Sequence, residues 1–231
     1  MIKFPNPATA GRELAGALQE FKNASETIVV AIASGGVFVA AEVARELTLR
    51  LELLFIRRLA APRGPQNVLC AVSAAGTLIV DDELLPLPSN PSTGLEYSVI
   101  DGIRQLRESE RFCRAERWPL NLAGKHVLLV DNGIHTGGTI EIAVAALRRL
   151  RVGKITAATP VADADSRDAI ESVADQIVCL AWPEKFGNAG LWYDDFARPT
   201  NEETLSLYLR SEETMNGRHA DRSGIHQKRE H

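Results

Sequence analysis

The chain has 231 residues, of which 45% are hydrophobic and 24% are charged, a balance typical of a folded protein with one large core. Its net charge of −4 argues against a general nucleic-acid binder, because such proteins usually carry a basic face. Three widely spaced cysteines argue against a disulfide framework or a zinc site. No apolar run approaches the ~20 residues that span a bilayer, and no signal-peptide pattern is visible, so we expect a cytoplasmic protein.

Apolar segments typical of buried strands alternate with helical patterns along most of the chain. The expected strands are 27–33, 51–57, 126–131, 154–162 and 176–182. The expected helices between them are 37–47, 138–150 and 166–175. Continuous apolar strands separated by helices indicate a mainly parallel sheet that is covered on both faces. Because such crossovers are right-handed, we predict a doubly wound α/β domain over residues 1–211.

Two regions interrupt this alternation. Residues 58–118 are expected to form an insertion that consists of a loop, a short hairpin at 70–82 and a helix at 94–118. The apolar stripe of this helix consists of Leu95, Val99, Ile103, Leu106 and Cys113. Residues 212–231 are polar and without apolar periodicity, so we expect a disordered tail, with a nucleic-acid or protein-binding role as the alternative.

The segment 127–147 carries the strongest functional signal. A buried strand ends at Asp131, a loop rich in glycine and threonine follows, and a helix starts near Gly138. Ligands of open α/β sheets bind at the carboxyl ends of strands, and the free N–H groups of a helix N-terminus suit phosphate. With an aspartate to accept hydrogen bonds from sugar hydroxyls, the pattern predicts a ribose phosphate site. The alternative is that Asn132-Gly133 forms only a hairpin turn, although a helical pattern follows it.

The stretch VLLVDNGIHTGGT at 127–139 resembles the diphosphate-sugar signature of type I phosphoribosyltransferases, which combines an apolar strand, two acidic residues and a T-G-x-T/S loop. Four further segments resemble a bacterial branch of this family, namely 34–47, 56–62, 158–166 and 190–196. The resemblance implies the type I phosphoribosyltransferase fold and an enzyme of nucleotide metabolism, commonly a homodimer. Such an enzyme binds 5-phosphoribosyl 1-diphosphate with Mg²⁺ and transfers phosphoribose to a nitrogenous base such as a purine.

The resemblance also assigns roles to individual residues. Asp131 and Asn132 occupy the paired acidic positions that hold the ribose hydroxyls, and Asp131 is the side chain expected to approach Mg²⁺, which the diphosphate mainly holds. The loop expected to hold the sugar and its 5-phosphate consists of Gly133, Ile134, His135, Thr136, Gly137, Gly138 and Thr139. The loop expected to contact the diphosphate consists of Ser34, Gly35 and Gly36. Arg57 and Arg58 would pair with diphosphate oxygens, with a solvated strand end as the alternative.

Three charges that most relatives carry near the site are missing here: Asn132 replaces an aspartate, Ser34 an arginine and Gln66 a glutamate. Two classes of function therefore stay open. One is a transferase, and the other is a binding module of the same fold that senses the diphosphate sugar or a nucleotide without turning it over. His135 directly precedes the Thr-Gly pair. Three interpretations of this histidine stay open: a general base, a donor to the phosphate, or an exposed loop residue without a role.

The segment 184–196 follows the last predicted strand, where the family places the acceptor base. It loosely resembles the hypoxanthine-guanine phosphoribosyltransferases. By that resemblance Lys185 would meet an exocyclic oxygen, Phe186 would stack on the base, and Asp194 would contact its far edge. The alternative is that the aromatic residues of this segment only cover the end of the sheet.

Overall fold

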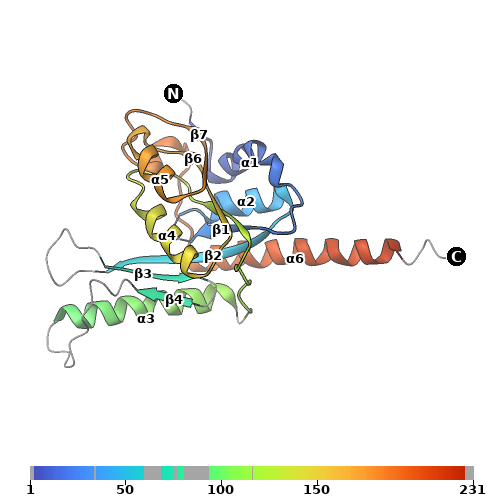
Figure 1. Ribbon diagram of the computed structural model, residues 1–231, viewed down its shortest axis with the longest axis horizontal. Coiled ribbons are helices and arrows are strands. Elements are labelled where there is room, and N and C mark those ends of the chain that lie inside the picture. Colours follow the sequence, from blue (N-terminus) through green and yellow to red (C-terminus); the bar gives the residue numbers. More distant parts are fainter. Residues whose placement is uncertain are drawn as a thin grey trace.

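The computed structural model describes residues 3–33, 35–59, 69–74, 77–80, 94–115 and 117–226 (Figure 1). The side chains of residues 58–99 and of residues beyond 214 lie outside this description.

The core of the molecule is a seven-stranded sheet with the order β4-β3-β2-β1-β5-β6-β7. Its five parallel strands are β1 (Thr27–Ile32), β2 (Arg50–Leu59), β5 (His126–Val130), β6 (Lys154–Val161) and β7 (Gln176–Ala181). The two antiparallel strands at the β2 edge are β3 (Leu69–Ala74) and β4 (Thr77–Val80). The predicted doubly wound, mainly parallel α/β fold with a hairpin insertion is therefore confirmed.

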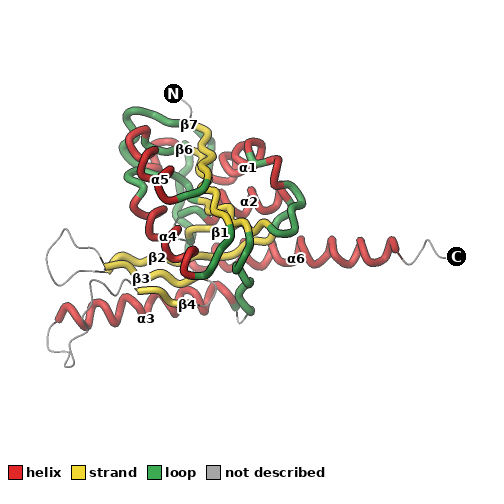
Figure 2. Tube along the Cα trace, in the orientation of Figure 1, coloured by secondary structure: helices red, strands yellow, loops and turns green. Residues whose placement is uncertain are grey.

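Six α-helices are found in the described part of the chain. Their bounds are α1 (Pro7–Ala17), α2 (Val37–Leu47), α3 (Gly94–Arg114), α4 (Gly138–Arg149), α5 (Arg167–Val173) and α6 (Asn201–His226). Helices α1, α2, α3 and α6 contribute to the hydrophobic core on one face of the sheet, and α4 and α5 to the core on the other. In Figure 2, α3 lies beside the antiparallel strands.

Strand β1 shows why both faces of the sheet are covered. All six of its residues are buried. Ile28, Val30 and Ile32 join the core beneath α4 and α5, whereas Val29 and Ala31 join the core beneath α1 and α2. Side chains alternate across a strand, so a continuous apolar run requires apolar partners on both sides.

The structure differs from the expectation of a disordered tail at 212–231, because α6 is helical through His226. The first half of α6 is fixed by Thr204 and Tyr208, of which only 3% and 1% are exposed. A helix that is anchored in this way adds one backbone hydrogen bond for each further residue, so it continues beyond the residues that pack. Figure 1 shows its C-terminal half projecting from the body of the protein. Residues 227–231 lie outside the described part.

A buried ionic cluster joins β2 to α3. The Glu52 side chain is fully buried, and its carboxylate lies 2.8 Å from Nη2 of Arg114. It also accepts hydrogen bonds from the backbone N–H groups of Leu53 and Leu120, at 2.7 and 2.9 Å. Glu110 pairs with Nε of the same arginine at 2.9 Å. Each buried charge of the cluster therefore has an opposite charge beside it.

Candidate functional site

The junction between β5 and α4 holds the predicted phosphate loop. Gly137 precedes α4 with φ of 82°, a conformation that glycine adopts more readily than any other residue. No side chain in the described part of the protein caps this helix end. The first N–H groups of α4 are therefore available to an anion, and the helix dipole favours negative charge there.

A hollow of about 380 Å³ opens over this loop. It is lined by Asp131, Gly133, Ile134, His135, Thr136, Gly137, Thr139 and Ile140. The structure thus brings the predicted loop residues around one space of a size that accommodates a phosphate ester. Gly138, the first residue of α4, is half-buried behind them.

Asp131 lies at the floor of this hollow with 9% of its surface exposed. Its Oδ1 accepts a hydrogen bond of 2.8 Å from the N–H of Asn132. Burial raises the pKa of the Asp131 carboxyl to about 7, although this hydrogen bond acts in the opposite direction. No cation among the described residues forms an ion pair with it, so the carboxyl is buried without a charged partner.

A second hollow of about 340 Å³ adjoins the first and shares Asp131, Gly133 and Thr139 with it. Its remaining lining residues are Gly35, Asn132, Asn188, Ala189, Gly190, Phe196 and Arg198. Asp131 is the single carboxylate among the described residues that line the two hollows. In the same part of the chain, no group of three or more His, Cys, Asp or Glu side chains is placed to hold a metal ion.

The glycines after β1 allow the two loops to approach closely. A Cβ on Gly36 would lie 2.5 Å from the Val130 carbonyl oxygen and 2.8 Å from Cα of Asp131. A Cβ on Gly35 would lie 3.0 Å from Nδ2 of Asn132. The loop after β1, which the resemblance expects to contact the diphosphate, therefore lies directly against the loop after β5.

Of the remaining residues predicted to contact diphosphate or to have lost a charge near it, the structure describes the side chain of Arg57 alone. Ser34 and Gln66 lie outside the described residues, as does the side chain of Arg58. Arg57 is exposed on β2 and lines neither hollow.

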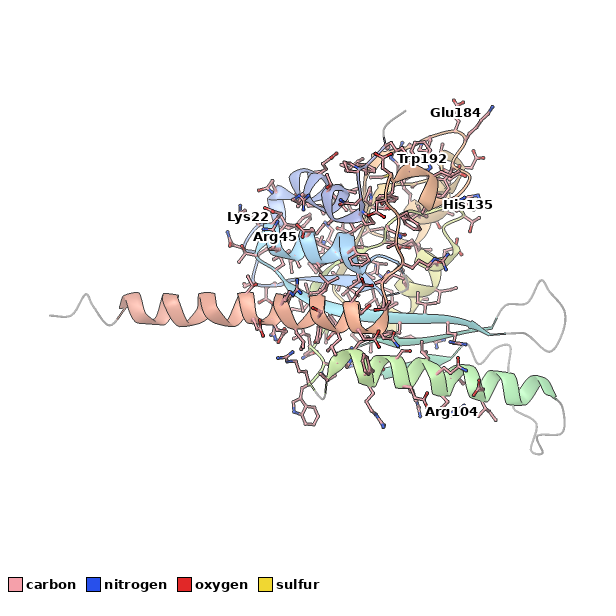
Figure 3. The ribbon with its side chains drawn as sticks, turned by 180° about the vertical axis from the view of Figure 1, so that it is seen from behind. Lys22, Arg45, Arg104, His135, Glu184 and Trp192 are labelled. Carbon is pink, nitrogen blue, oxygen red and sulfur yellow. The ribbon has the colours of Figure 1, made fainter. Side chains whose placement is uncertain are left out.

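His135 projects from the loop with 59% of its side chain exposed. Its Nε2 lies 3.6 Å from Oδ2 of Asp163, and its ring stacks on Phe186 with ring centroids 5.5 Å apart. Figure 3 shows His135 at the same end of the molecule as Trp192. These two contacts orient the His135 ring, and the sequence alone does not predict this orientation.

The three residues predicted to hold the acceptor base do not line either hollow. Lys185 is exposed, and the exposed Asp194 pairs with Lys3 at 2.8 Å. Phe186 is only 2% exposed, and its carbonyl accepts a hydrogen bond of 2.9 Å from Trp192 Nε1. In this arrangement Phe186 has no open face on which a base can stack.

Asn188 and Phe196 from the same segment line the second hollow instead, together with Arg198 just beyond its end. They lie in irregular structure, where no periodic signal distinguishes them from their neighbours.

The start of the chain holds this segment in place. The N–H of Phe4 donates to the Trp192 carbonyl, and the N–H of Asp194 donates to the Phe4 carbonyl, both at 2.9 Å. The hydroxyl of Tyr193 donates to the backbone carbonyl of Asn132. The N-terminal residues, the segment after β7 and the loop after β5 are therefore linked directly.

These features define an α/β protein with a candidate site at the carboxyl ends of parallel strands, where the geometry suits a phosphate ester. The phosphoribosyl transferase domain family matches residues 4–194 of the chain. The chain belongs to this family, as the signature at 127–139 indicates. None of the described helices is long and apolar enough to cross a membrane.

Similar proteins agree with this assignment. The chain is 30% identical over 218 residues to a protein of Mycobacterium tuberculosis, from strains CDC 1551 and H37Rv, that is provisionally named a phosphoribosyl transferase. That match covers 91% of this chain and 47% of the relative, so the chain spans about half the length of the curated relatives it matches. The crystal structure of TT1426 from Thermus thermophilus superimposes with a TM-score of 0.73 at 29% identity, over 90% of this chain and 99% of that one.

Proposed function

We propose that the protein binds 5-phosphoribosyl 1-diphosphate with Mg²⁺ and transfers its phosphoribosyl group to a nitrogenous base. One observation carries the proposal: an uncapped helix N-terminus and two threonine residues line a hollow whose floor is the buried Asp131. A phosphate at one end and a sugar diol at the other satisfy both halves of this arrangement.

Different residues of the site would bind different parts of the ligand. Thr136, Thr139 and the first N–H groups of α4 would bind the 5-phosphate. Asp131 and Asn132 would hold the ribose hydroxyls at the boundary between the two hollows. The diphosphate would lie toward Gly35 and Gly36, where no side chain of this loop separates a ligand from the backbone.

Asp131 also has a role in the chemistry. When the bond between C1 of ribose and the diphosphate breaks, positive charge develops on the sugar ring and negative charge on the leaving group. A carboxylate held beside the ring stabilises this positive charge. Mg²⁺ supplies the matching stabilisation of the leaving group, and a single nearby carboxylate suits an ion that diphosphate oxygens and water mainly hold.

A second candidate is a module that senses the diphosphate sugar or a nucleotide without turning it over. The position of Asn132 favours it, because this buried amide stands beside Asp131 where a second carboxylate would add charge under the ribose. One unit charge at about 5 Å with an effective dielectric constant near 20 contributes about 3 kcal/mol, which corresponds to roughly a hundredfold in rate.

Calorimetry tests the binding step that both candidates share. Wild-type protein with Mg²⁺ should bind phosphoribosyl diphosphate, and Thr139→Val should weaken binding about 10- to 100-fold, since a hydrogen bond to a charged group contributes about 1.5–3 kcal/mol. Thr214→Val, on the exposed part of α6, is the matched control and should bind as the wild type does. Equal affinities for all three proteins would contradict the assignment of the loop.

Release of diphosphate in the presence of a panel of purines and pyrimidines separates the two candidates. A transferase releases diphosphate with at least one base, and Asn132→Asp should increase the rate. A sensing module binds the sugar and releases none with any base. The cytoplasmic location and the homodimer belong to the same proposal, and sedimentation of the purified chain tests the second of these.

A further inference from the structure

Among the described residues that line the second hollow, one cation has no ion pair. Arg198 is exposed and lines this hollow, and no carboxylate among the described residues forms an ion pair with it. The nearby Asp194 is held by Lys3. The carboxyl of Asp131 lies buried on the floor, where its Oδ1 already accepts the N–H of Asn132. The accessible charge of this hollow is therefore the guanidinium of Arg198.

Part of the lining of the second hollow is apolar. The half-buried ring of Phe196, the methyl group of Ala189 and the backbone of Gly190 form this part. An aromatic ring suits contact with a planar heterocycle. The side-chain amide of Asn188 adds one donor group and one acceptor for polar atoms at the edge of a ring.

We propose that the second hollow selects an acceptor base that carries a carboxylate, and that Arg198 recognises this carboxylate. A guanidinium presents two parallel N–H groups that match the two oxygens of a carboxylate. That the bound molecule is an acceptor rests on the proposed function, whereas the recognition of its carboxylate is independent of turnover. A neutral purine, by contrast, leaves the arginine without a partner.

Two pairs of small molecules test the inference, because the members of each pair differ chiefly in the carboxylate. They are orotate with uracil, and nicotinate with nicotinamide. Binding to the full chain is measured by calorimetry, with and without phosphoribosyl diphosphate and Mg²⁺. We expect the carboxylated member of at least one pair to bind 10- to 100-fold more tightly than its neutral partner.

Three variants identify the residue responsible. Arg198→Gln should remove the preference for the carboxylate, and Arg198→Lys should retain part of it, because the charge remains while the paired N–H groups are lost. Arg210→Gln is the matched control. Arg210 is also an exposed arginine without an ion pair in the described residues, but it lines a separate hollow between α2 and α6. This control should keep the full preference.

Three results would overturn the inference. The first is equal affinity for the charged and neutral members of both pairs, and the second is a preference that survives in Arg198→Gln. The third is a loss of affinity for inorganic diphosphate or the diphosphate sugar in Arg198→Gln with the acceptor preference unchanged, which would assign the guanidinium to the leaving group. Wild-type protein that binds no phosphoribosyl diphosphate would contradict the proposed function instead, and the four acceptors alone would still test the inference.

Discussion

Two carboxyl groups of this protein are buried to similar degrees but have different surroundings. Glu52 is fully buried between β2 and α3, where Arg114 and two backbone N–H groups bind it. Asp131 is 9% exposed at the end of β5, where one backbone N–H donates to it and no described cation pairs with it. Burial of a charge is costly unless it is paired, so Arg114 offsets the cost of burying Glu52, whereas no cation among the described residues does so for Asp131.

The largest expected effect comes from unpairing Glu52. Arg114→Met leaves a fully buried carboxylate without its cation, and should lower the free energy of unfolding by about 3–5 kcal/mol. Urea unfolding measures this change, and Arg210→Met on exposed α6 is the control. In the double variant with Glu52→Gln, part of the loss should be recovered, because the remaining buried group is neutral. If Arg114→Met lowers the free energy of unfolding by less than about 1 kcal/mol, Glu52 does not depend on its cation, and the stated difference between Glu52 and Asp131 is wrong.

A change of the opposite sign in the free energy of unfolding is expected when the charge of Asp131 is removed. Since its pKa rises from 3.8 to about 7 on folding, the folded protein keeps a proton that the unfolded chain loses between these values. The free energy of unfolding therefore falls as pH rises from about 4 to 7, by up to about 4 kcal/mol, and the loss is complete above pH 7.

Asp131→Asn should remove this cost and stabilise the protein at pH 8, with little change at pH 4, while abolishing turnover. Urea unfolding of both proteins at the two pH values provides the measurement. A variant that is less stable than the wild type at pH 8 would show that the carboxylate has a partner in the folded state.

A third expected effect concerns the close packing beneath Asp131. In Gly36→Ala, the new Cβ would press on the Val130 carbonyl and on Cα of Asp131, which should cost about 1–3 kcal/mol and weaken binding of the diphosphate sugar. Gly16→Ala is a control with open space around the new atom, and it should stabilise α1 by about 0.5–1 kcal/mol. Thermal unfolding compares the stability of the two variants, and calorimetry compares their affinity for the diphosphate sugar. Equal results for both variants would contradict the close contact at Gly36.

The smallest expected effect on stability is at His135. Because the His135 side chain is 59% exposed and its Nε2 lies as far as 3.6 Å from Asp163, His135→Ala should change the free energy of unfolding by less than about 0.5 kcal/mol. If the ring acts as a base, turnover should fall more than affinity for the diphosphate sugar. Steady-state kinetics beside calorimetry checks this, and equal losses in both would leave the histidine a binding role.

The sequence predicts the parallel strands and the phosphate loop because both have local signals. Buried strands are continuously apolar, and a strand, a glycine-threonine loop and a helix follow one another directly at 126–150. Helix α1 lacks such a signal because it packs on α2 through small residues. A Cβ on Gly11 would lie 2.5 Å from the Val39 carbonyl oxygen, so the contact face cannot be large and apolar.

The wall of the second hollow is not predictable in this way. Asn188, Phe196 and Arg198 face it because contacts distant in sequence hold an irregular segment against the sheet. Lys185 and Phe186 fit a family pattern only loosely, and the fold directs Lys185 to solvent and Phe186 into packed side chains. Spacing along the chain carries no information about such contacts.

The backbone pairing of Phe4 with the segment around Tyr193 has a practical consequence for handling the protein. A purification tag or fusion partner joined close to Lys3 would lie beside the hydrogen bonds that Phe4 makes with this segment. We expect such an attachment to disturb the wall of the second hollow beside Arg198, and kinetic data from tagged protein would include this effect. The far end of α6 extends away from the sheet and is the safer place for an attachment (Figure 1).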